Sequence, residues 1–446
     1  MSADALVPAE TVALLDGTGQ PRLTEAVLAA VAELGLSGPR HDLTAEVFAP
    51  CQGCFECWTD HPGTCKANDA ANGVMRDVIG AELVLWTTRI RFGCWGPTAK
   101  AALDKSIGLL SPFFATVERE THHRRRYDRY PRWGVVAVVP PGTGDDERQL
   151  FRRLVARNAI NVHSDRHAVV FVEENASVEE IRTSVRDALV QLRAGAPLPF
   201  AAQAAFAPRD PASGVPLDPA RARHAVLWVG SAKAHGTSSS ESLGRAMIER
   251  LAARGWTTEV AHVAKLVRLR RSQSSELVET LARADLIVLA SPVYVDSLPA
   301  LVLAGLARLA DAPLGSRPPA LLPIVQCGFP ELAHTVLALE VLATAARRIG
   351  LPWAGHLALG GGGVIGGRPL DTLGGRVSHQ TAALDAAADE LDAGAPVSPA
   401  TSARFARTFI GAGLYRVLGD LGWIGIAIRH GSLTKLWQRP FDDAAG

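Results

Sequence analysis

The chain has 446 residues, a formal net charge of +1 and 48% hydrophobic residues. Its length exceeds that of one ordinary hydrophobic core, which predicts two or more domains. The near-neutral charge gives no field that would attract nucleic acid, and no apolar run approaches the roughly 20 residues of a transmembrane helix. The first residues lack the basic and apolar regions of a secretion signal, so we expect a cytoplasmic protein with reduced cysteines.

The first half of the chain alternates between short apolar strands and helical patterns. VALLDG at 12–17 is a buried strand that enters a glycine turn, and the helical pattern LTEAVLAAVAELG follows it. Further strands are expected within 81–93 and 133–147, with the helix PTAKAALDKSIGLL after the first of them. Apolar strands spaced by helices predict a parallel sheet covered on both faces.

Four of the six cysteines lie close together in CQGCFECWTDHPGTC, between the first two of these strands. They are Cys51, Cys54, Cys57 and Cys65. Four thiolates in one compact loop can bind a [4Fe–4S] cluster or a zinc ion. A redox-active dithiol and a packed loop of reduced thiols remain open alternatives.

The second half repeats the design of the first. AVLWVGS at 225–231 is followed by the helical pattern SESLGRAMIERLAARG, ADLIVLASPVYVD at 284–296 aligns residue for residue with 81–93, and ALLPIVQCGFPE at 320–331 corresponds to 133–147. The right-handed rule for parallel strand–helix–strand units then predicts two tandem doubly wound α/β domains, each a three-layer α/β/α sandwich.

The composition suggests where these domains begin and end. We expect a first domain at 1–195, a Pro-, Ala- and Gly-rich linker at 196–222, a second domain at 223–400 and a helical tail at 401–446. The tail has apolar residues at helical spacing with Arg and Lys between them. It is predicted to pack on its own domain or on a partner subunit, and a helix at a membrane surface is the alternative.

Three loops of the second domain follow its predicted strands and would meet at one edge of the sheet, where ligands bind in doubly wound folds. GSAKAHGTSSSESL at 230–243 offers glycines, hydroxyls and a helix N-terminus, which suit a phosphate group. SPVYVDSLPA at 291–300 offers Tyr294 as a flat wall, and QCGFPE at 326–331 offers backbone amides near Gly328. A phosphate site beside a flat wall suggests flavin mononucleotide (FMN).

The same segments, with GLPWAGHLALGGGGVIGG, resemble the flavodoxin-like NAD(P)H-dependent FMN reductases, and the first half resembles a related branch that includes iron–sulfur flavoproteins. The resemblance implies that the FMN phosphate is held by Ser231, Lys233, Thr237, Ser238 and Ser239. It implies that the flavin ring is lined by Pro292, Val293, Tyr294 and Val295 and approached at its far edge by Cys327 and Gly328. It assigns no catalytic side chain, because the flavin itself performs the chemistry.

The first domain departs from this pattern. Its loop DGTGQPRLTEA is shorter and has only Thr18 and Thr24 as hydroxyl candidates, and Arg89 and Arg91 replace Pro292 and Tyr294. A weak FMN site, a site for another anion and a domain without cofactor all remain open. The basic segment THHRRRYDRYP is expected to be a loop at the flavin entrance or at a dimer contact.

The sequence therefore predicts an FMN-dependent NAD(P)H oxidoreductase that passes a hydride from the nicotinamide to the flavin and on to an unidentified small-molecule acceptor, such as a quinone. One alternative is an iron–sulfur flavoprotein that carries electrons. Another is a first domain without catalysis that serves dimerisation or regulation. The association is expected to be a homodimer or a pseudo-dimer formed within one chain.

Overall fold

The computed structural model describes residues 10–46, 48–197, 206, 214–215, 223–263 and 274–445. It contains two five-stranded parallel sheets. In spatial order, the first sheet holds β2 (Arg40–Asp42), β1 (Val12–Asp16), β3 (Leu83–Arg89), β6 (Arg132–Val139) and β7 (His167–Glu173). The second holds β9 (Thr257–His262), β8 (His224–Val229), β10 (Leu286–Pro292), β11 (Ala320–Gln326) and β12 (Leu357–Leu359).

Within each sheet the second strand of the repeat lies at the edge, followed by the first, third, fourth and fifth. This is the order of flavodoxin-like sheets. Leu83 pairs with Val12 in the first sheet, and Leu286 pairs with Ala225 in the second, as the aligned repeats require. The predicted fold of two tandem doubly wound domains is confirmed.

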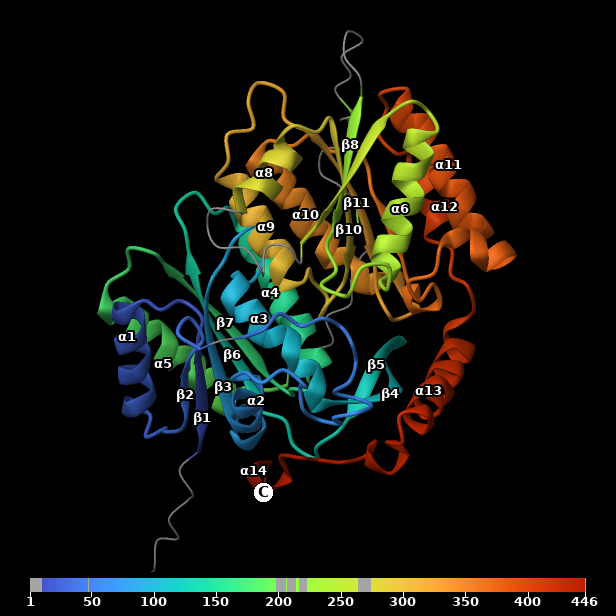
Figure 1. Ribbon diagram of the computed structural model, residues 1–446. Helices are drawn as coiled ribbons and strands as arrows, with labels where there is room; N and C mark the ends of the chain where they lie inside the picture. Colours follow the sequence, from blue (N-terminus) through green and yellow to red (C-terminus); the bar gives the residue numbers. More distant parts are fainter. Residues whose placement is uncertain are drawn as a thin grey trace, which may run out of the picture.

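Helices cover both faces of each sheet (Figure 1). The first domain contains α1 (Pro21–Glu33), α2 (Ala71–Gly80), α3 (Pro97–Lys105), α4 (Asp145–Asn161) and α5 (Val178–Ala194). The second contains α6 (Ser239–Ala252), α8 (Ser274–Ala282), α9 (Ala300–Ala310), α10 (Val336–Ile349) and α11 (Ser378–Asp392). Short 3-10 helices occupy Ser106–Leu109, Leu332–Thr335, Gly362–Val364, Leu370–Val377 and Leu433–Lys435.

The two domains share the apolar core that lies between their sheets. Helices α1 and α5 form a separate core on the outer face of the first sheet, and α6 and α11 form one on the outer face of the second. The inner helices of both domains join in a single buried cluster. Within it α3 packs on α9 and α4 on α10, and each pair follows the same strand of the repeat. The halves therefore meet as the two subunits of a symmetric dimer would.

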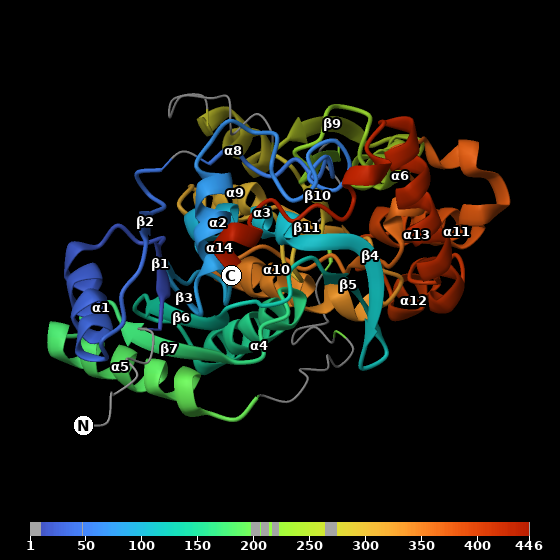
Figure 2. The same ribbon diagram turned by 90° about the horizontal axis from the view of Figure 1, so that it is seen from below.

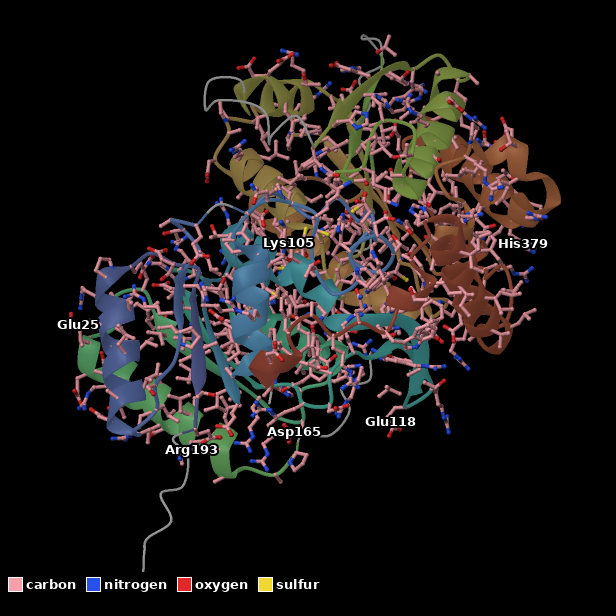
Figure 3. All side chains as sticks on the ribbon, turned by 60° about the horizontal axis from the view of Figure 1, so that its bottom comes forward. Glu25, Lys105, Glu118, Asp165, Arg193 and His379 are labelled. Atoms are coloured by element: carbon pink, nitrogen blue, oxygen red, sulfur yellow. The ribbon has the colours of Figure 1, made fainter. Side chains whose placement is uncertain are left out.

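The basic segment expected to be a loop is a strand in its first part. β5 (Glu120–Arg125) pairs antiparallel with β4 (Leu110–Val117). Glu118 and Arg119, between them, both have positive φ, which matches the right-handed twist of a two-residue hairpin turn. The hairpin extends from the first domain toward the tail (Figure 2), and Glu118 marks its outer tip (Figure 3). Tertiary pairing with β4 overrides the loop-like composition of this segment.

The tail contains α12 (Pro399–Phe405), α13 (Ala412–Arg429) and α14 (Asp442–Ala445). α12 packs on α11, α13 lies against β4, and α14 lies against α2, so the tail contacts both domains. No helix among the described residues is long and apolar enough to cross a membrane. Most of the predicted linker lies outside the described residues, so the exact domain boundaries stay a prediction.

Candidate functional site

The loop between β8 and α6 forms a cradle of backbone amides and hydroxyls. Gly230 donates its N–H to Ala290 O at 2.8 Å, and a Cβ at Gly230 would lie 2.9 Å from Val302. Ser238 caps α6, because its hydroxyl accepts the N–H of Glu241 at 3.0 Å. The first-turn N–H groups of a helix have no partner within the helix and carry its positive dipole end, so this edge suits a phosphate group.

The structure places all five predicted phosphate residues on this loop. Ser231 and Ser238 are buried, and the hydroxyl of Thr237 donates to Ala234 O at 2.6 Å. Lys233 is half-buried, and its Nζ lies 5.2 Å from the ring centre of Phe55 in the first domain. Burial lowers the pKa of Lys233, against the opposing effect of the nearby Cys54 and Cys51 thiols.

Glu241, in the first turn of α6, contacts this loop and was not identified from the sequence. Its buried carboxylate accepts the N–H of Gly236 at 2.7 Å and the Nε of Arg245 at 2.8 Å. Burial alone would raise the pKa of Glu241, but these bonds outweigh it and leave the pKa lowered. The pattern Ser-x-x-Glu at 238–241, a capping-box signature, could have flagged this residue.

The turn after β10 is unusual in its backbone. Tyr294 and Ser297 exchange two backbone hydrogen bonds of 2.7 and 3.1 Å, and the residues between them, Val295 and Asp296, have φ values of 52° and 56°. A β-branched residue such as Val is seldom found in this left-handed region, and such residues each cost on the order of 1–3 kcal/mol. The surrounding structure must therefore hold this turn in place.

The first domain supplies most of that support. Lys100 Nζ donates to Tyr294 O at 3.0 Å, and Asn158 Nδ2 donates to Val295 O at 2.8 Å. The Sγ of Cys94 lies 3.1 Å from Ser297 Oγ, and these residues occupy equivalent positions in the two repeats. The turn of one repeat thus meets the turn of the other at the pseudo-two-fold axis.

Three ion pairs made by two buried cations reinforce this contact. Arg157 lies between Glu120, at 2.6 Å, and Asp296, at 3.3 Å. Burial would raise the pKa of Asp296, but Arg157 and His334 lower it strongly. Lys100 pairs with Asp104, whose other oxygen accepts the N–H of Ala300 at the start of α9 at 2.9 Å.

The loop after β11 connects the cradle to the turn. Gln326 Nε2 donates to Ser240 Oγ at 3.1 Å, and Gln326 O accepts the N–H of Val293 at 2.8 Å. Cys327 is buried, and its Sγ donates to Phe329 O at 3.2 Å. Gly328 has open space where a side chain would project, and its carbonyl accepts the hydroxyl of Tyr415 from α13.

The cysteine loop of the first domain lies on this site, which the sequence did not predict. Gly53 has φ of 63°, and a Cβ there would lie 2.3 Å from the hydroxyl of Tyr294 and 3.6 Å from Lys233 Cε. Burial, with the Cys51 thiol, raises the pKa of Tyr294 well above its usual value. Tyr294 therefore faces the cysteine loop with its hydroxyl end.

The four thiols are not arranged as a zinc site. All six cysteines are free thiols, and burial raises the pKa of Cys51 to about 12 and raises that of Cys57 further. Among the described residues, no three of the sulfur atoms lie within 4.8 Å of one another. Sulfurs bound at about 2.3 Å to one tetrahedral zinc would be closer together than this.

In each of two other groups of potential metal ligands, an arginine pairs with the carboxylate of the group. Glu120, His122 and His334 gather at the domain interface, where Arg157 pairs with Glu120. His235, Glu241 and His262 gather at the phosphate loop, where Arg245 pairs with Glu241. In both groups the carboxylate charge is already matched by a guanidinium group.

The corresponding loop of the first domain is filled by its own anion. Asp16, at the end of β1, accepts the N–H groups of Thr18 and Gly19 at 3.0 and 3.3 Å, and hydroxyl groups of Thr18, Thr24 and Thr87. Its counterpart in the second domain is the apolar Val229. The donors that would meet a phosphate are thus occupied by a carboxylate.

The cavity beside Asp16 also disfavours a phosphate group. Its volume is about 400 Å³, and it is lined by Asp16, Gly19, Pro21, Thr24, Glu25, Leu28, Arg40 and Asp42. Three carboxylates face one guanidinium group, which makes this cavity acidic. Thr18 and Thr24, the two hydroxyl candidates of the sequence, therefore serve Asp16.

The strand order of both sheets, with the strand-end loops gathered at one edge, is that of flavodoxin-like domains. Residues 224–346, within the second domain, match the model of the NADPH-dependent FMN reductase family. This confirms the predicted resemblance, and the protein is an NAD(P)H-dependent flavin oxidoreductase. The search of curated proteins found no match.

Several solved structures are similar to one domain of this chain. An NAD(P)H:quinone oxidoreductase from Methanothermobacter marburgensis is 18% identical, with 38% of this chain and 96% of that chain covered and a TM-score of 0.30. An NADH:FMN oxidoreductase in its apo form is 22% identical, with 40% of this chain and 94% of that chain covered and a TM-score of 0.30. An azoreductase from Bacillus anthracis str. Sterne is 12% identical, with 38% of this chain and 99% of that chain covered and a TM-score of 0.28. At these values the similarities carry no argument about function.

We predict that Ser238→Asp weakens FMN binding by about 30-fold. Asp still caps α6, but its carboxylate repels the phosphate by roughly 2 kcal/mol at this short distance. Fluorescence titration of the flavin-free protein with FMN measures the effect. Ser177→Asp is the matched control, because Ser177 caps α5 in the same way in the first domain. Equal affinities in all three proteins would remove the phosphate assignment.

We also predict a pH-dependent contribution of Asp16 to stability. Burial raises the pKa of Asp16, but the Thr24, Thr87 and Thr18 hydrogen bonds outweigh it and leave the pKa below its ordinary value. The stabilisation is therefore complete above about pH 4, the unfolded pKa, and is lost as pH falls through the folded pKa.

In urea unfolding, Asp16→Asn should lower the free energy of unfolding by about 2 kcal/mol at pH 7 and by progressively less below pH 4. The fully exposed Asp145 provides the control variant Asp145→Asn. If the free energies of unfolding of the wild type and Asp16→Asn differ by the same amount down to about pH 2, the assigned charge state of Asp16 is wrong.

Proposed function

We propose that the protein oxidises NAD(P)H with a single FMN held by its second domain and reduces a planar, quinone-like small molecule. FMN supplies the chemistry when bound, because it accepts a hydride and passes the electrons on. A cytoplasmic location, where NAD(P)H is available, is part of this proposal. The observation that carries it is the asymmetry at the two strand ends: Asp16 occupies the donors of the first loop, whereas the buried, apolar Val229 stands at the same position before the second.

The residues of the second domain have assigned places in this proposal. The phosphate is held by Ser231, Lys233, Thr237, Ser238 and Ser239. The ring is lined by Pro292, Val293, Tyr294 and Val295, with Cys327 and Gly328 at its edge. In support of the fit, Gly328 leaves open space beside a carbonyl fixed by Tyr415, and the loop leads into the N-terminus of α6.

The first domain takes the part of a partner subunit in this proposal. Its side chains hold the 294–297 turn, and its cysteine loop covers Tyr294 and Lys233. At the equivalent turn of the first domain, Arg91 forms an exposed ion pair of 2.8 Å with Asp311 of the second domain. The turn of the second domain thus receives buried hydrogen bonds, whereas that of the first receives an exposed ion pair. This difference favours a flavin-free first domain that supports the second, as in a pseudo-dimer within one chain.

The acceptor class rests on the aromatic residues next to Gly328. The Phe329 ring lies 4.7 Å from His334, 5.1 Å from His123 and 5.9 Å from Phe114. Burial lowers the pKa of His123 to about 3, so this ring is neutral at physiological pH. Aromatic rings beside a neutral His123 favour a flat, apolar acceptor.

Electron transfer through a metal cluster is the second candidate function. Cys51, Cys54, Cys57 and Cys65 would hold the cluster. The observation that favours it is the contact of Gly53, within this loop, with Tyr294, since a cluster there would be close enough to exchange electrons with the ring. Iron and sulfide analysis of protein purified without air distinguishes the two functions, because the reductase alone requires neither.

We predict that NADH or NADPH bleaches the flavin absorbance of the FMN-loaded protein under anaerobic conditions, and that a simple benzoquinone restores it. Stopped-flow absorbance measures both steps. Free FMN at the same concentration is the control for non-enzymatic reduction. A bound flavin that both nicotinamides leave oxidised would overturn the reductase and favour the electron carrier.

A further inference from the structure

Helix α13 has two different faces. Its inner face packs on the protein: Ala427 is fully buried, the Trp423 ring centre lies 5.0 Å from that of Trp58, and Asp420 accepts the N–H of Phe114 at 2.8 Å. A Cβ at Gly419 would lie 2.3 Å from the Phe114 ring, so the helix is closely seated on the hairpin.

The outer face is apolar and uncovered. Five large side chains on it are each between 50% and 59% exposed, and they form what we call the tail stripe: Leu414, Val417, Leu418, Leu421 and Ile428. Their spacing of three, four and seven residues places them along one side of the helix. Trp437, further along the tail, is 62% exposed. The helix lies at the outer edge of the molecule (Figure 1), so no described element covers the stripe.

The segment that carries the stripe is positively charged, although two of its cations, Arg416 and Arg439, pair with Glu331 and Asp128. Residues 404–439 contain six cations and one acidic residue, a net charge of +5 in a chain whose total is +1. The acidic residue, Asp420, lies on the inner face and pairs with Arg124. Arg429 and Lys435 follow the stripe and are exposed, and the exposed Arg404 and Arg407 precede it in the chain.

This charge indicates which kind of surface binds the stripe. A second copy of the chain would bring the same cations face to face, which opposes a symmetric contact. An anionic lipid surface offers both partners that the stripe needs, an apolar layer for the leucines and phosphate groups for the cations. Exposed Trp is also the side chain that settles at the boundary between lipid and water.

We propose that α13 docks the protein on anionic lipid bilayers. The tail stripe would lie in the lipid–water interface, and no segment would cross the bilayer. Tyr415, on the inner face of the same helix, contacts Gly328 and lies 3.3 Å from the Cβ position of Gly361. Docking therefore brings the loops of the candidate flavin site next to a bilayer, where apolar acceptors dissolve. Lipid binding itself does not depend on the proposed function.

The test is flotation of the full-length protein with vesicles of equal parts phosphatidylglycerol and phosphatidylcholine. The protein is expected to float with these vesicles, to remain behind with pure phosphatidylcholine, and to detach at high salt as its charges are screened. Leu421→Asp should reduce the bound fraction about tenfold, because it places a charge in the stripe. Val190→Asp is the matched control, since Val190 is 46% exposed on α5, far along the chain.

Three results would overturn the proposal. The first is that the wild-type protein does not bind anionic vesicles. The second is that Leu421→Asp and Val190→Asp lose the same fraction of vesicle binding. The third is a wild-type dimer that Leu421→Asp converts to a monomer, because the stripe would then be a self-association surface. Flavin content and NADPH bleaching are measured on the same samples without lipid, so a failure of the reductase assignment is seen separately.

Discussion

The structure depends on one strained turn and on what holds it. Val295 and Asp296 adopt left-handed backbone conformations between the paired residues Tyr294 and Ser297. The β-branched Val295 strongly disfavours that conformation, so the turn needs hydrogen bonds from other segments to persist. Lys100, Asn158 and Arg157 provide them from the first domain, at buried positions where hydrogen bonds are difficult to replace with water.

This constraint explains why two similar domains can have different tasks. The first domain supports the candidate flavin loops of the second, and in its own loop Asp16 stands where the second domain has the apolar Val229. The carboxylate satisfies donors that a phosphate would otherwise satisfy, and it stabilises the first domain without a ligand. The chain thus contains both a candidate reductase domain and its partner.

Much of the fold could be read from the sequence. Buried parallel strands are apolar along their whole length, so the runs at 81–93 and 284–296 were visible and could be aligned. The three loops of the second domain followed from the strand order, because ligands bind at one edge of such sheets. The family match to residues 224–346 confirms the predicted family resemblance of the second half.

The contacts that distinguish the two domains could not be read in this way. Lys100 reaches a residue 194 positions further along the chain, and Asn158 one 137 positions further. Local periodicity has no information about such pairs, because they form only when the helical layers dock. The same holds for the cysteine loop, whose motif suggested a metal but whose position on Tyr294 depends on the docked interface.

The central claim is that one chain holds one flavin, in the second domain, with the first domain as support. Native mass spectrometry of the protein saturated with FMN measures this directly, because each bound flavin adds a fixed mass to the chain. The account predicts one FMN per chain at saturation. Two FMN molecules per chain, or none, would contradict it.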